Sequence, residues 1–219
     1  PAQNAEQLAV MVRKTLAYEA QTGDLGWRSN ALLVADNDEP GFAEETAAFA
    51  GELGATQSAQ VTIDGDGVNA REALGKAFAD GVGLVGYFGH GSITLWGKEN
   101  VFDVAAAGKL RNARLPIVFT VTCLSGFFEH PTTVSLGETL LRQADGGAVA
   151  ALVPSSAAVL TDQRLLADGL AKALADPAPR ALGDMVLDAQ RALPQQEGGV
   201  REILLTFNLL GDPSMTVRR

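Results

Sequence analysis

Hydrophobic positions follow two different periods along this chain. A helix over residues 5–20 is predicted by residues that recur at helical spacing: Leu8, Met11, Val12, Thr15 and Leu16. Residues 31–35 instead form a short continuous apolar run, which is typical of a strand buried on both faces. Because stripes and runs of these two kinds alternate along the chain, we expect helices and strands to alternate as well.

The same two signals predict the remaining elements. Further strands are expected at residues 61–63, 84–88, 117–122 and 148–153. Further helices are expected at residues 42–53, 70–79, 135–143, 162–175 and 182–193. Turns are expected at residues 64–67 and 176–180, and a loop at Gly198-Gly199. This alternation predicts an α/β fold whose mainly parallel sheet is covered by helices on both faces.

Composition narrows the classes of function. Of the 219 residues, 47% are hydrophobic and 20% are charged, as expected of a globular protein with a sizeable core, and we expect a single domain over residues 1–219. The 17 Lys and Arg residues against 26 Asp and Glu residues give a net charge of −9, without a basic patch. Nucleic acid and anionic membrane surfaces are therefore not expected as partners.

The chain contains no obvious targeting segment. Its longest apolar run, residues 147–154, is far shorter than the roughly 20 residues that cross a bilayer, and no stretch resembles a signal peptide. The chain begins at Pro1 and enters a helical pattern at once, so we expect a domain cut from a longer precursor.

Reactive side chains lie directly after two of the predicted strands. His90, between Gly89 and Gly91, follows the strand at 84–88, and Cys123, the only cysteine, follows the strand at 117–122. In a doubly wound sheet, reactive groups gather beyond the carboxyl ends of the strands. If these two strands are neighbours, His90 and Cys123 face each other.

Such a pair suits nucleophilic catalysis. A thiol has a reference pKa of about 8.5, so it needs a nearby base such as His90 to favour the thiolate. The thiolate would attack a peptide carbonyl to give a thioester, and the imidazolium would protonate the leaving amine. The backbone amides of Gly91 and Cys123 are the candidate oxyanion hole.

Plainer interpretations of these residues stay open. A single cysteine at the end of an apolar strand is often a buried, inert thiol, and a histidine between glycines is often a turn residue. His130, the other histidine, precedes Pro131 and is interpreted as a loop residue.

Three blocks of the sequence resemble the gingipain family of cysteine peptidases, whose members share the fold of caspases. Residues 86–92, which contain Gly89-His90-Gly91-Ser92, resemble the histidine motif of the family, and residues 115–128 resemble its nucleophile segment. Residues 208–214, with Gly-Asp-Pro-Ser at their end, resemble the signature that closes the family's catalytic domain.

The resemblance implies a caspase-like three-layer sandwich and a cysteine endopeptidase with Cys123 as nucleophile and His90 as base. It further implies protein or peptide substrates, flanking domains in the same bacterial precursor, and a secreted or cell-surface location. Trp96 and the segment Ser155-Ser156 are the candidate substrate-binding residues, although Ser155-Ser156 could equally be a plain loop.

The family also carries an acidic residue that orients the catalytic histidine. An ungapped match assigns this role to Asp38, with Asp36 as the alternative. The same oxygen-rich loop could be a turn or could bind Ca²⁺ through Asp36 and Asp38; no other cofactor is expected.

Other functions compete with the endopeptidase. A sortase-like transpeptidase would pass the thioester to an amine, and a catalytically inactive domain would serve as a scaffold. The acidic residue that gives the best-known family members their preference for Arg or Lys has no clear match in this chain. A nucleotide-binding role is disfavoured, because the glycine-rich turns match neither the P-loop nor the dinucleotide fingerprint.

Overall fold

A six-stranded sheet forms the middle of the molecule. The computed structural model describes residues 1–54, 57–157, 160–194 and 200–218. The strands of the sheet are β1 (Asn30–Ala35), β2 (Gln57–Thr62), β3 (Leu84–Phe88), β6 (Ile117–Val121), β7 (Ala150–Pro154) and β9 (Phe207–Leu210). They lie in the order β2-β1-β3-β6-β7-β9, and all neighbours are parallel except β7 and β9. The residues of β3, β6 and β7 are all buried, as their apolar runs predict.

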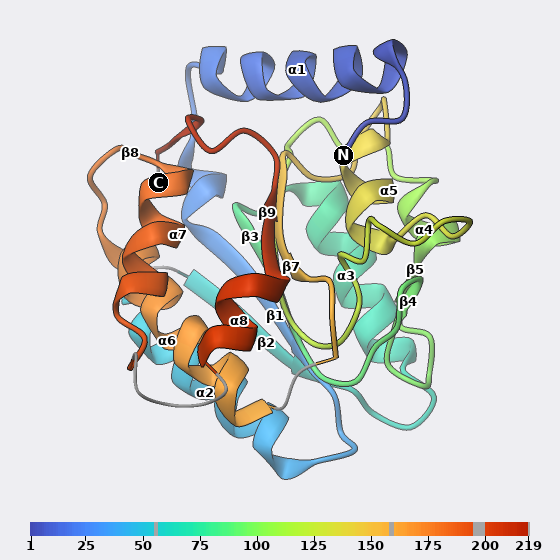
Figure 1. The fold of residues 1–219 in the computed structure, drawn as a ribbon, viewed down its shortest axis with the longest axis vertical. Coiled ribbons are helices and arrows are strands. Elements are labelled where there is room, and N and C mark those ends of the chain that lie inside the picture. The colour runs from blue at the N-terminus through green and yellow to red at the C-terminus, as the bar shows by residue number, and fades with distance from the viewer. Residues whose placement is uncertain (55–56, 158–159, 195–199, 219) are drawn as a thin grey trace.

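Helices cover both faces of this sheet (Figure 1). One face carries α2 (Pro40–Glu52), α6 (Leu160–Ala175), α7 (Leu182–Arg191) and α8 (Val200–Thr206). The other face carries α3 (Val68–Asp80), α4 (Val104–Ala107) and α5 (Leu136–Arg142). Phe49 stacks on Phe119 in the first layer, with ring centroids 5.5 Å apart, and Phe78 stacks on Phe102 in the second, also at 5.5 Å. The predicted α/β class with three layers is confirmed.

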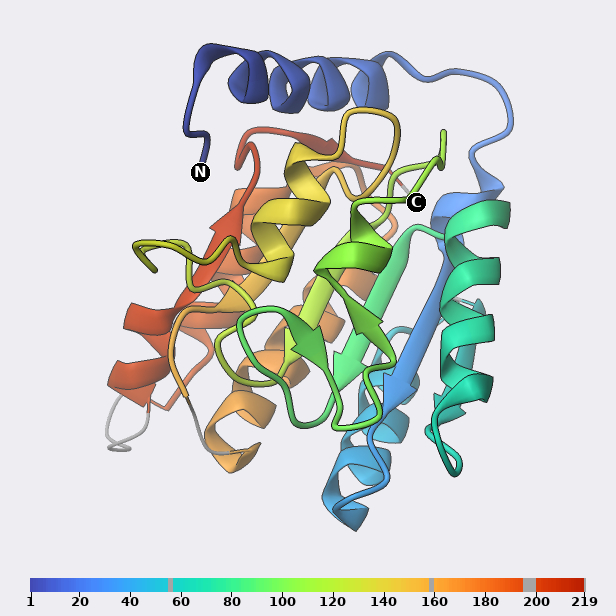
Figure 2. The same ribbon diagram turned by 90° about the vertical axis from the view of Figure 1, so that its right-hand side faces the viewer.

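Helix α1 (Ala5–Ala20) lies across the amino ends of the parallel strands (Figures 1 and 2). Its bounds are the predicted ones, but only part of the predicted stripe faces the core, namely Met11 and Thr15. Leu8, Val12 and Leu16 are 54%, 48% and 61% exposed, whereas Lys14 is only 6% exposed. The Lys14 ammonium donates to the carbonyl oxygens of Leu140, at 2.9 Å, and of two further residues at the end of α5. The helix therefore packs through the Lys14 cap on α5 together with Val10, Met11, Thr15 and Tyr18, and leaves Leu8, Val12 and Leu16 in solvent.

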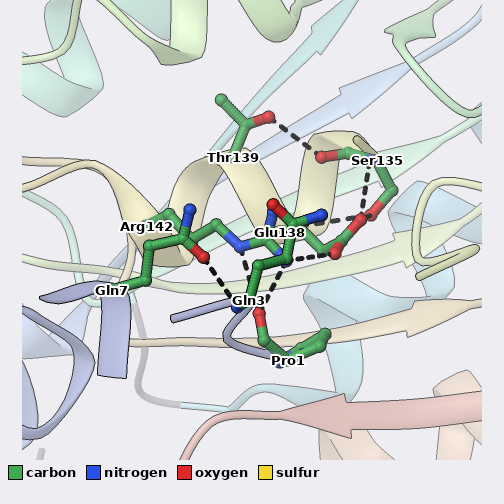
Figure 3. A network of polar contacts seen from close by, with 7 residues as sticks. All are labelled: Pro1, Gln3, Gln7, Ser135, Glu138, Thr139 and Arg142. Atoms are coloured by element: carbon green, nitrogen blue, oxygen red, sulfur yellow. Dashed lines mark hydrogen bonds and ion pairs between the residues drawn. The ribbon is translucent and has the colours of Figure 1, made fainter. Parts of the chain in front are cut away.

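A polar network fixes both ends of α5 (Figure 3). Ser135 and Glu138 form a capping box at its start. The Glu138 carboxylate also pairs with Arg142, whose guanidinium donates to the carbonyl oxygen of Pro1 at 2.8 and 3.0 Å. The beginning of the chain is thus held against the helix that follows the Cys123 loop.

Several short elements were not predicted. These are the 3-10 turn η1 (Gly26–Ser29), helices α4 and α8, and strands β4 (Leu95–Trp96), β5 (Phe102–Asp103), β8 (Arg180–Ala181), β9 and β10 (Thr216–Val217). Strand β9 follows α8 without an intervening turn, so the sequence offers no signal that separates them. Edge strand β2 is longer than the predicted 61–63, because its mostly exposed, polar residues form no apolar run. The predicted loop at Gly198-Gly199 lies outside the described residues. In the part of the chain that the structure describes, no helix has the length and apolar character to span a membrane.

Candidate active site

The carboxyl ends of three neighbouring strands lie level with one another. Ala35 of β1 pairs with Phe88 of β3, and Phe88 pairs with Val121 of β6. The residues that follow these strands are therefore brought to the same edge of the sheet. This places the loops that contain Asp36, His90 and Cys123 side by side, and β3 and β6 are neighbours, as the sequence argument for His90 and Cys123 requires.

A buried acid holds the backbone of His90. Asp36 is fully buried, and its Oδ2 accepts a hydrogen bond from the His90 amide at 3.0 Å. The Tyr87 hydroxyl donates to the His90 carbonyl oxygen at 2.7 Å and lies 3.3 Å from the same Oδ2. Burial and the neighbouring Asp36 carboxylate raise the pKa of Tyr87 above its ordinary value, so this hydroxyl keeps its proton. Hydrogen bonds thus hold both the amide and the carbonyl oxygen of His90, which fixes the backbone from which its imidazole extends.

The imidazole of His90 has different neighbours. Its Nε2 lies 3.2 Å from Oε1 of Glu39, and the edge of its ring meets Phe42, with ring centroids 5.2 Å apart. Glu39 is the residue directly before α2, and Phe42 lies in the first turn of that helix. The ring is 53% exposed, which leaves it accessible from solvent.

His90 and Cys123 line one pocket of about 270 Å³. The rest of the lining comes from the start of α2, the ends of β3 and β6 and the start of α6: Glu39, Phe42, Gly89, Val121, Thr122, Leu160 and Gln163. Cys123 is half-buried and cannot form an internal disulfide, because the chain has no second cysteine. The pocket therefore exposes the thiol and the imidazole to the same bound group.

A strained turn follows Cys123. Leu124 has a φ of +58°, a left-handed conformation that non-glycine residues rarely adopt. Its amide donates to the Ser156 carbonyl oxygen at 3.2 Å, and the Gly126 amide donates to the Pro154 carbonyl oxygen at 2.8 Å. The end of β7 and the segment after it thus hold the nucleophile loop in a sharp bend.

Gly91 lets the two loops approach closely. A Cβ atom at this position would lie 2.4 Å from Thr122 Oγ1 and 3.2 Å from the Leu95 carbonyl oxygen, so only glycine fits without movement. Among the described residues, the Gly91 amide has no hydrogen-bond acceptor. Thr122 Oγ1 is buried and likewise lacks a partner in the described part of the chain. A donor at Gly91 is thus available to a group bound beside Cys123.

Two predicted site residues, Asp38 and Trp96, are not part of the described lining of the pocket. Asp38 forms an ion pair with Lys98, and its amide donates to Asp36 Oδ1 at 3.2 Å. Trp96 is 1% exposed and stacks on Tyr87 with ring centroids 4.9 Å apart. A ring buried in this way has no surface for a substrate, so its packing supports Tyr87 and, through Tyr87, the His90 loop.

The segment Ser155-Ser156 lies next to the nucleophile loop and is half-buried. Ser155 Oγ donates to the Thr206 carbonyl oxygen at 3.2 Å and accepts from the Asn208 side chain at 3.0 Å. Neither serine is part of the described lining of the pocket, and a role in substrate binding stays a prediction.

Sequence reasoning missed four residues of the described pocket lining: Glu39, Phe42, Leu160 and Gln163. Phe42 was assigned to a helix stripe, which is correct, but its position in the first turn of α2 also turns it toward His90. Gln163 lies in the first part of α6, far along the chain from either motif. Only the register of the sheet and the packing of α2 on α6 bring these residues together.

The remaining candidates lie apart from the pocket. His130 is in a loop, as predicted, where Nδ1 accepts from the Thr133 amide at 2.9 Å. The described residues contain no group of three or more His, Cys, Asp or Glu side chains arranged to hold a metal ion. Calcium binding through Asp36 and Asp38 stays a prediction, with Asp36 already engaged by His90 and Asp38 by Lys98.

Comparison with known proteins matches the model of peptidase family C25 over residues 1–218. The chain belongs to peptidase family C25. The resemblance to gingipains drawn from its three sequence blocks is thereby confirmed, and with it the interpretation as a catalytic domain of gingipain type.

Two gingipains of Porphyromonas gingivalis are similar to nearly the whole chain. Gingipain R2 of strain ATCC 33277 is 28% identical over 237 aligned residues, which cover 99% of this chain and 32% of the relative. Gingipain R1 is also 28% identical over 237 aligned residues and is covered to 23%. The chain therefore spans about a third or less of these relatives, and C25 members of this kind are much longer polypeptides.

Solved structures confirm the fold. The crystal structure of the Arg-specific cysteine proteinase gingipain R (RgpB) aligns with a TM-score of 0.87 and 22% identity over 99% of this chain and 54% of that chain. A complex of the RgpB pro- and mature domains gives the same TM-score at 23% identity, over 99% of this chain and 55% of that one.

Proposed function

We propose that this chain is the catalytic domain of a cysteine endopeptidase in which Cys123 is the nucleophile and His90 the base. The observation that carries the proposal is that both residues line the same pocket beyond the carboxyl ends of β3 and β6. Membership of peptidase family C25 supports it independently.

In the proposed reaction, His90 removes the proton of the Cys123 thiol, and the thiolate attacks the carbonyl carbon of a bound peptide. The tetrahedral intermediate collapses to a thioester as the imidazolium donates its proton to the departing amine. A water molecule, deprotonated by His90, then attacks the thioester, releases the carboxylic acid and restores the thiol. Each half of the reaction uses the same imidazole, first as base and then as acid.

The oxyanion formed in both halves needs hydrogen-bond donors. The Gly91 amide is suited to this role, because it has no acceptor among the described residues and lies beside Thr122, next to the nucleophile. The Cys123 amide, at the start of the strained turn, is the second proposed donor.

We propose Glu39, in place of Asp38 or Asp36, as the residue that orients the imidazole. Its carboxylate contacts Nε2, which leaves Nδ1 to serve the thiol. Asp36 contributes differently, since it fixes the backbone of His90, and Asp38 is engaged by Lys98. The proposed acid thus comes from the loop that the sequence indicates, but it is a different residue of that loop.

Protein or peptide substrates follow from the proposed reaction. A secreted or cell-surface location and flanking domains in the same polypeptide are proposed from the family, whose members named above are much longer than this chain.

The decisive experiment is labelling of the full-length protein with peptidyl acyloxymethyl ketones, with the adduct located by mass spectrometry. Labelling is expected at Cys123 and should be lost in Cys123→Ala. It should also be lost in His90→Ala, while His130→Ala is the matched control because its ring lies in a loop outside the pocket. Labelling of Cys123 that does not require His90 would contradict the dyad.

The fate of the thioester separates hydrolysis from transpeptidation. Incubation of a cleavable peptide with an excess of glycine amide should yield the free acid as the main product. A predominant amine-linked product would instead identify a sortase-like transpeptidase that uses the same two residues.

A further inference from the structure

The turn between β4 and β5 returns to the backbone of His90. Its first residue, Gly97, donates its amide to the His90 carbonyl oxygen at 2.9 Å. The same oxygen accepts from the Tyr87 hydroxyl at 2.7 Å. The next residue of the turn, Lys98, extends to the acidic loop, residues 36–39, which follows β1. One lysine thus joins two segments that both contact the His90 loop.

The Lys98 ammonium lies beside acids from both segments. It forms an ion pair with Asp38 of the acidic loop, and its Nζ lies 3.8 Å from Oε1 of Glu99 in the turn. The side chain of Glu99 is only 6% exposed and that of Asp38 is 21% exposed. The hydrogen bond to Asp38 raises the pKa of Lys98, and the charges of Glu99 and Asp36 add to this, so the ammonium keeps its charge.

Three carboxylates gather around the Tyr87 hydroxyl. Besides burial, the charges of Asp36, Glu99 and Asp38 raise the pKa of Tyr87. Like charges repel, so this arrangement of acids needs a cation beside it. Asp36 is fully buried and accepts from the His90 amide, so it cannot move outward without losing that bond. Asp38 lies closer to solvent and is the acid that a missing counter-charge would release.

Glu39, the acid proposed to orient the imidazole, is the next residue after Asp38. Its carboxylate lies 3.2 Å from His90 Nε2, and its side chain makes no capping hydrogen bond with α2. The position of Glu39 therefore depends on the backbone of the acidic loop. We infer that Lys98 is a positioning residue, whose ion pair with Asp38 keeps Glu39 in contact with the imidazole. The inference rests on the proposed function.

This role concerns activity more than stability. The Lys98 side chain is 67% exposed, and an ion pair of this kind contributes little to the stability of a fold, so its removal should leave the protein folded. A small displacement of an orienting group nevertheless lowers the rate, because the reaction depends on the positions of the reacting groups. Lys98 is not part of the described lining of the pocket, so its effect on the reaction has to pass through another residue.

Lys98→Met in the full-length protein tests the inference. We expect kcat for a peptide substrate to fall by about threefold to fivefold, with KM nearly unchanged, because the side chain lies outside the described pocket lining. Lys98→Arg retains the charge and should keep kcat within about twofold of the unchanged protein. Lys76→Met removes a similarly exposed ion pair, with Asp80 on α3, and is the matched control that should leave kcat unchanged.

A double-mutant cycle asks whether Lys98 acts through Glu39. In Glu39→Gln the orienting carboxylate is already gone, so the addition of Lys98→Met should lower kcat by less than about twofold. If the two changes instead multiplied their separate effects, Lys98 would act independently of Glu39 and the inference would be overturned. A loss in Lys98→Met that Lys98→Arg did not restore would also overturn it, because the charge would not be what matters.

The inference and the proposed function fail in different ways. If the full-length protein cleaves no peptide, or if cleavage persists in Cys123→Ala, the proposed function is contradicted, and the inference with it. If cleavage requires Cys123 but kcat is the same in Lys98→Met as in the unchanged protein, the peptidase stands and the inference alone is wrong.

Discussion

Two acids of one loop contact different parts of the same histidine. The Asp36 carboxylate accepts from the backbone amide of His90, while the Glu39 carboxylate contacts the ring nitrogen Nε2. The first contact is buried and structural. The second is half exposed, so its contribution is expected to be smaller than that of a fully buried triad acid.

Glu39→Gln removes the charge beside His90 and retains the shape of the side chain. We expect kcat/KM for a peptide substrate to fall by about tenfold or more, well short of the roughly 10⁴-fold loss seen when a buried triad acid is neutralised. Thermal stability should change little, because the side chain is 56% exposed. Steady-state kinetics check this, with Glu44→Gln on the exposed face of α2 as control.

Asp38→Asn is the informative comparison. It removes an ion pair with Lys98 at the surface and should cost less activity than Glu39→Gln. If Asp38→Asn were instead the more damaging change, Asp38 would be the orienting acid, as the ungapped sequence match predicts.

Glu45 is the residue for which a pH effect on stability is expected. Burial raises its pKa from 4.5 to about 7, although Arg164 lies beside it. Below pH 4.5 the carboxyl is protonated in both the folded and the unfolded chain. As the pH rises from 4.5 to 7, the unfolded chain releases its proton first, so this group lowers the stability of the fold, and the full penalty is present above pH 7.

Glu45→Gln should therefore stabilise the protein at pH 8, by about 1–3 kcal/mol, and have little effect at pH 4. Urea unfolding at the two pH values measures the difference, and Glu44→Gln, exposed on the same helix, should show no such pH dependence. A variant that is less stable at pH 8 would mean that the pair with Arg164 outweighs the burial of the charge.

At the scale of elements, α1 and α5 depend on one buried lysine. The Lys14 ammonium lies 2.9, 3.0 and 3.3 Å from the carbonyl oxygens of Leu140, Leu141 and Gln143. These groups belong to the end of α5, where carbonyl oxygens have no partner within the helix. The lysine thus joins two elements that are more than a hundred residues apart in the sequence.

Lys14→Met should destabilise the fold by about 2–4 kcal/mol, because it removes the Lys14 donor from the carbonyl oxygens of Leu141 and Gln143, whereas the Leu140 carbonyl oxygen still accepts from the Ala148 amide. Arg13→Met changes the exposed neighbour and should stay within about 0.5 kcal/mol of the unchanged protein. Denaturant unfolding of the two variants tests the pair; equal effects would show that the cap on α5 contributes nothing.

The contact between the His90 and Cys123 loops depends on the absence of a side chain at Gly91. In Gly91→Ala, the new methyl group would lie 2.4 Å from Thr122 Oγ1 and force the two loops apart. We expect kcat/KM to fall by about a hundredfold or more, because misplacing catalytic groups by about 1 Å has effects of this size. Gly75→Ala, where a Cβ meets nothing within 4 Å, is the control and should leave activity unchanged.

Removal of Thr122 Oγ1 should relieve the clash that Gly91→Ala creates. The double variant Gly91→Ala, Thr122→Ala should recover part of the activity lost in Gly91→Ala. If it recovered none, the loss would not arise from contact with Thr122 Oγ1, and the close approach to the Leu95 carbonyl oxygen would be the remaining contact to test.

At the scale of the whole molecule, the sequence predicts the layers better than it predicts the pocket. Short apolar runs such as residues 84–88 identify buried strands because a parallel sheet covered on both faces needs apolar residues on both sides. Strand β9 and helix α8 were not predicted, because they follow each other directly and neither shows a distinct hydrophobic period. The orientation of α1 was only partly predicted, since Met11 and Thr15 of the stripe pack inward beside a buried lysine, whereas Leu8, Val12 and Leu16 are exposed.

Some residues of the candidate site were likewise predicted from the sequence, and others were not. His90 and Cys123 are visible from the sequence, because each follows a strongly apolar strand and belongs to a family motif. Glu39 and Gln163 are not visible, because their relevance depends on how α2 and α6 pack beside the strand ends. Distance along the chain carries no information about that packing.

The position of α1 also matters for handling the protein. Helix α1 crosses the amino ends of the parallel strands (Figure 2), while the described lining of the pocket includes residues at the carboxyl ends of β3 and β6. A tether attached at an exposed α1 position such as Val12 would therefore anchor the protein to a sensor surface by its far end. Peptides in the flowing solution would still reach the thiol, so immobilised molecules should retain turnover.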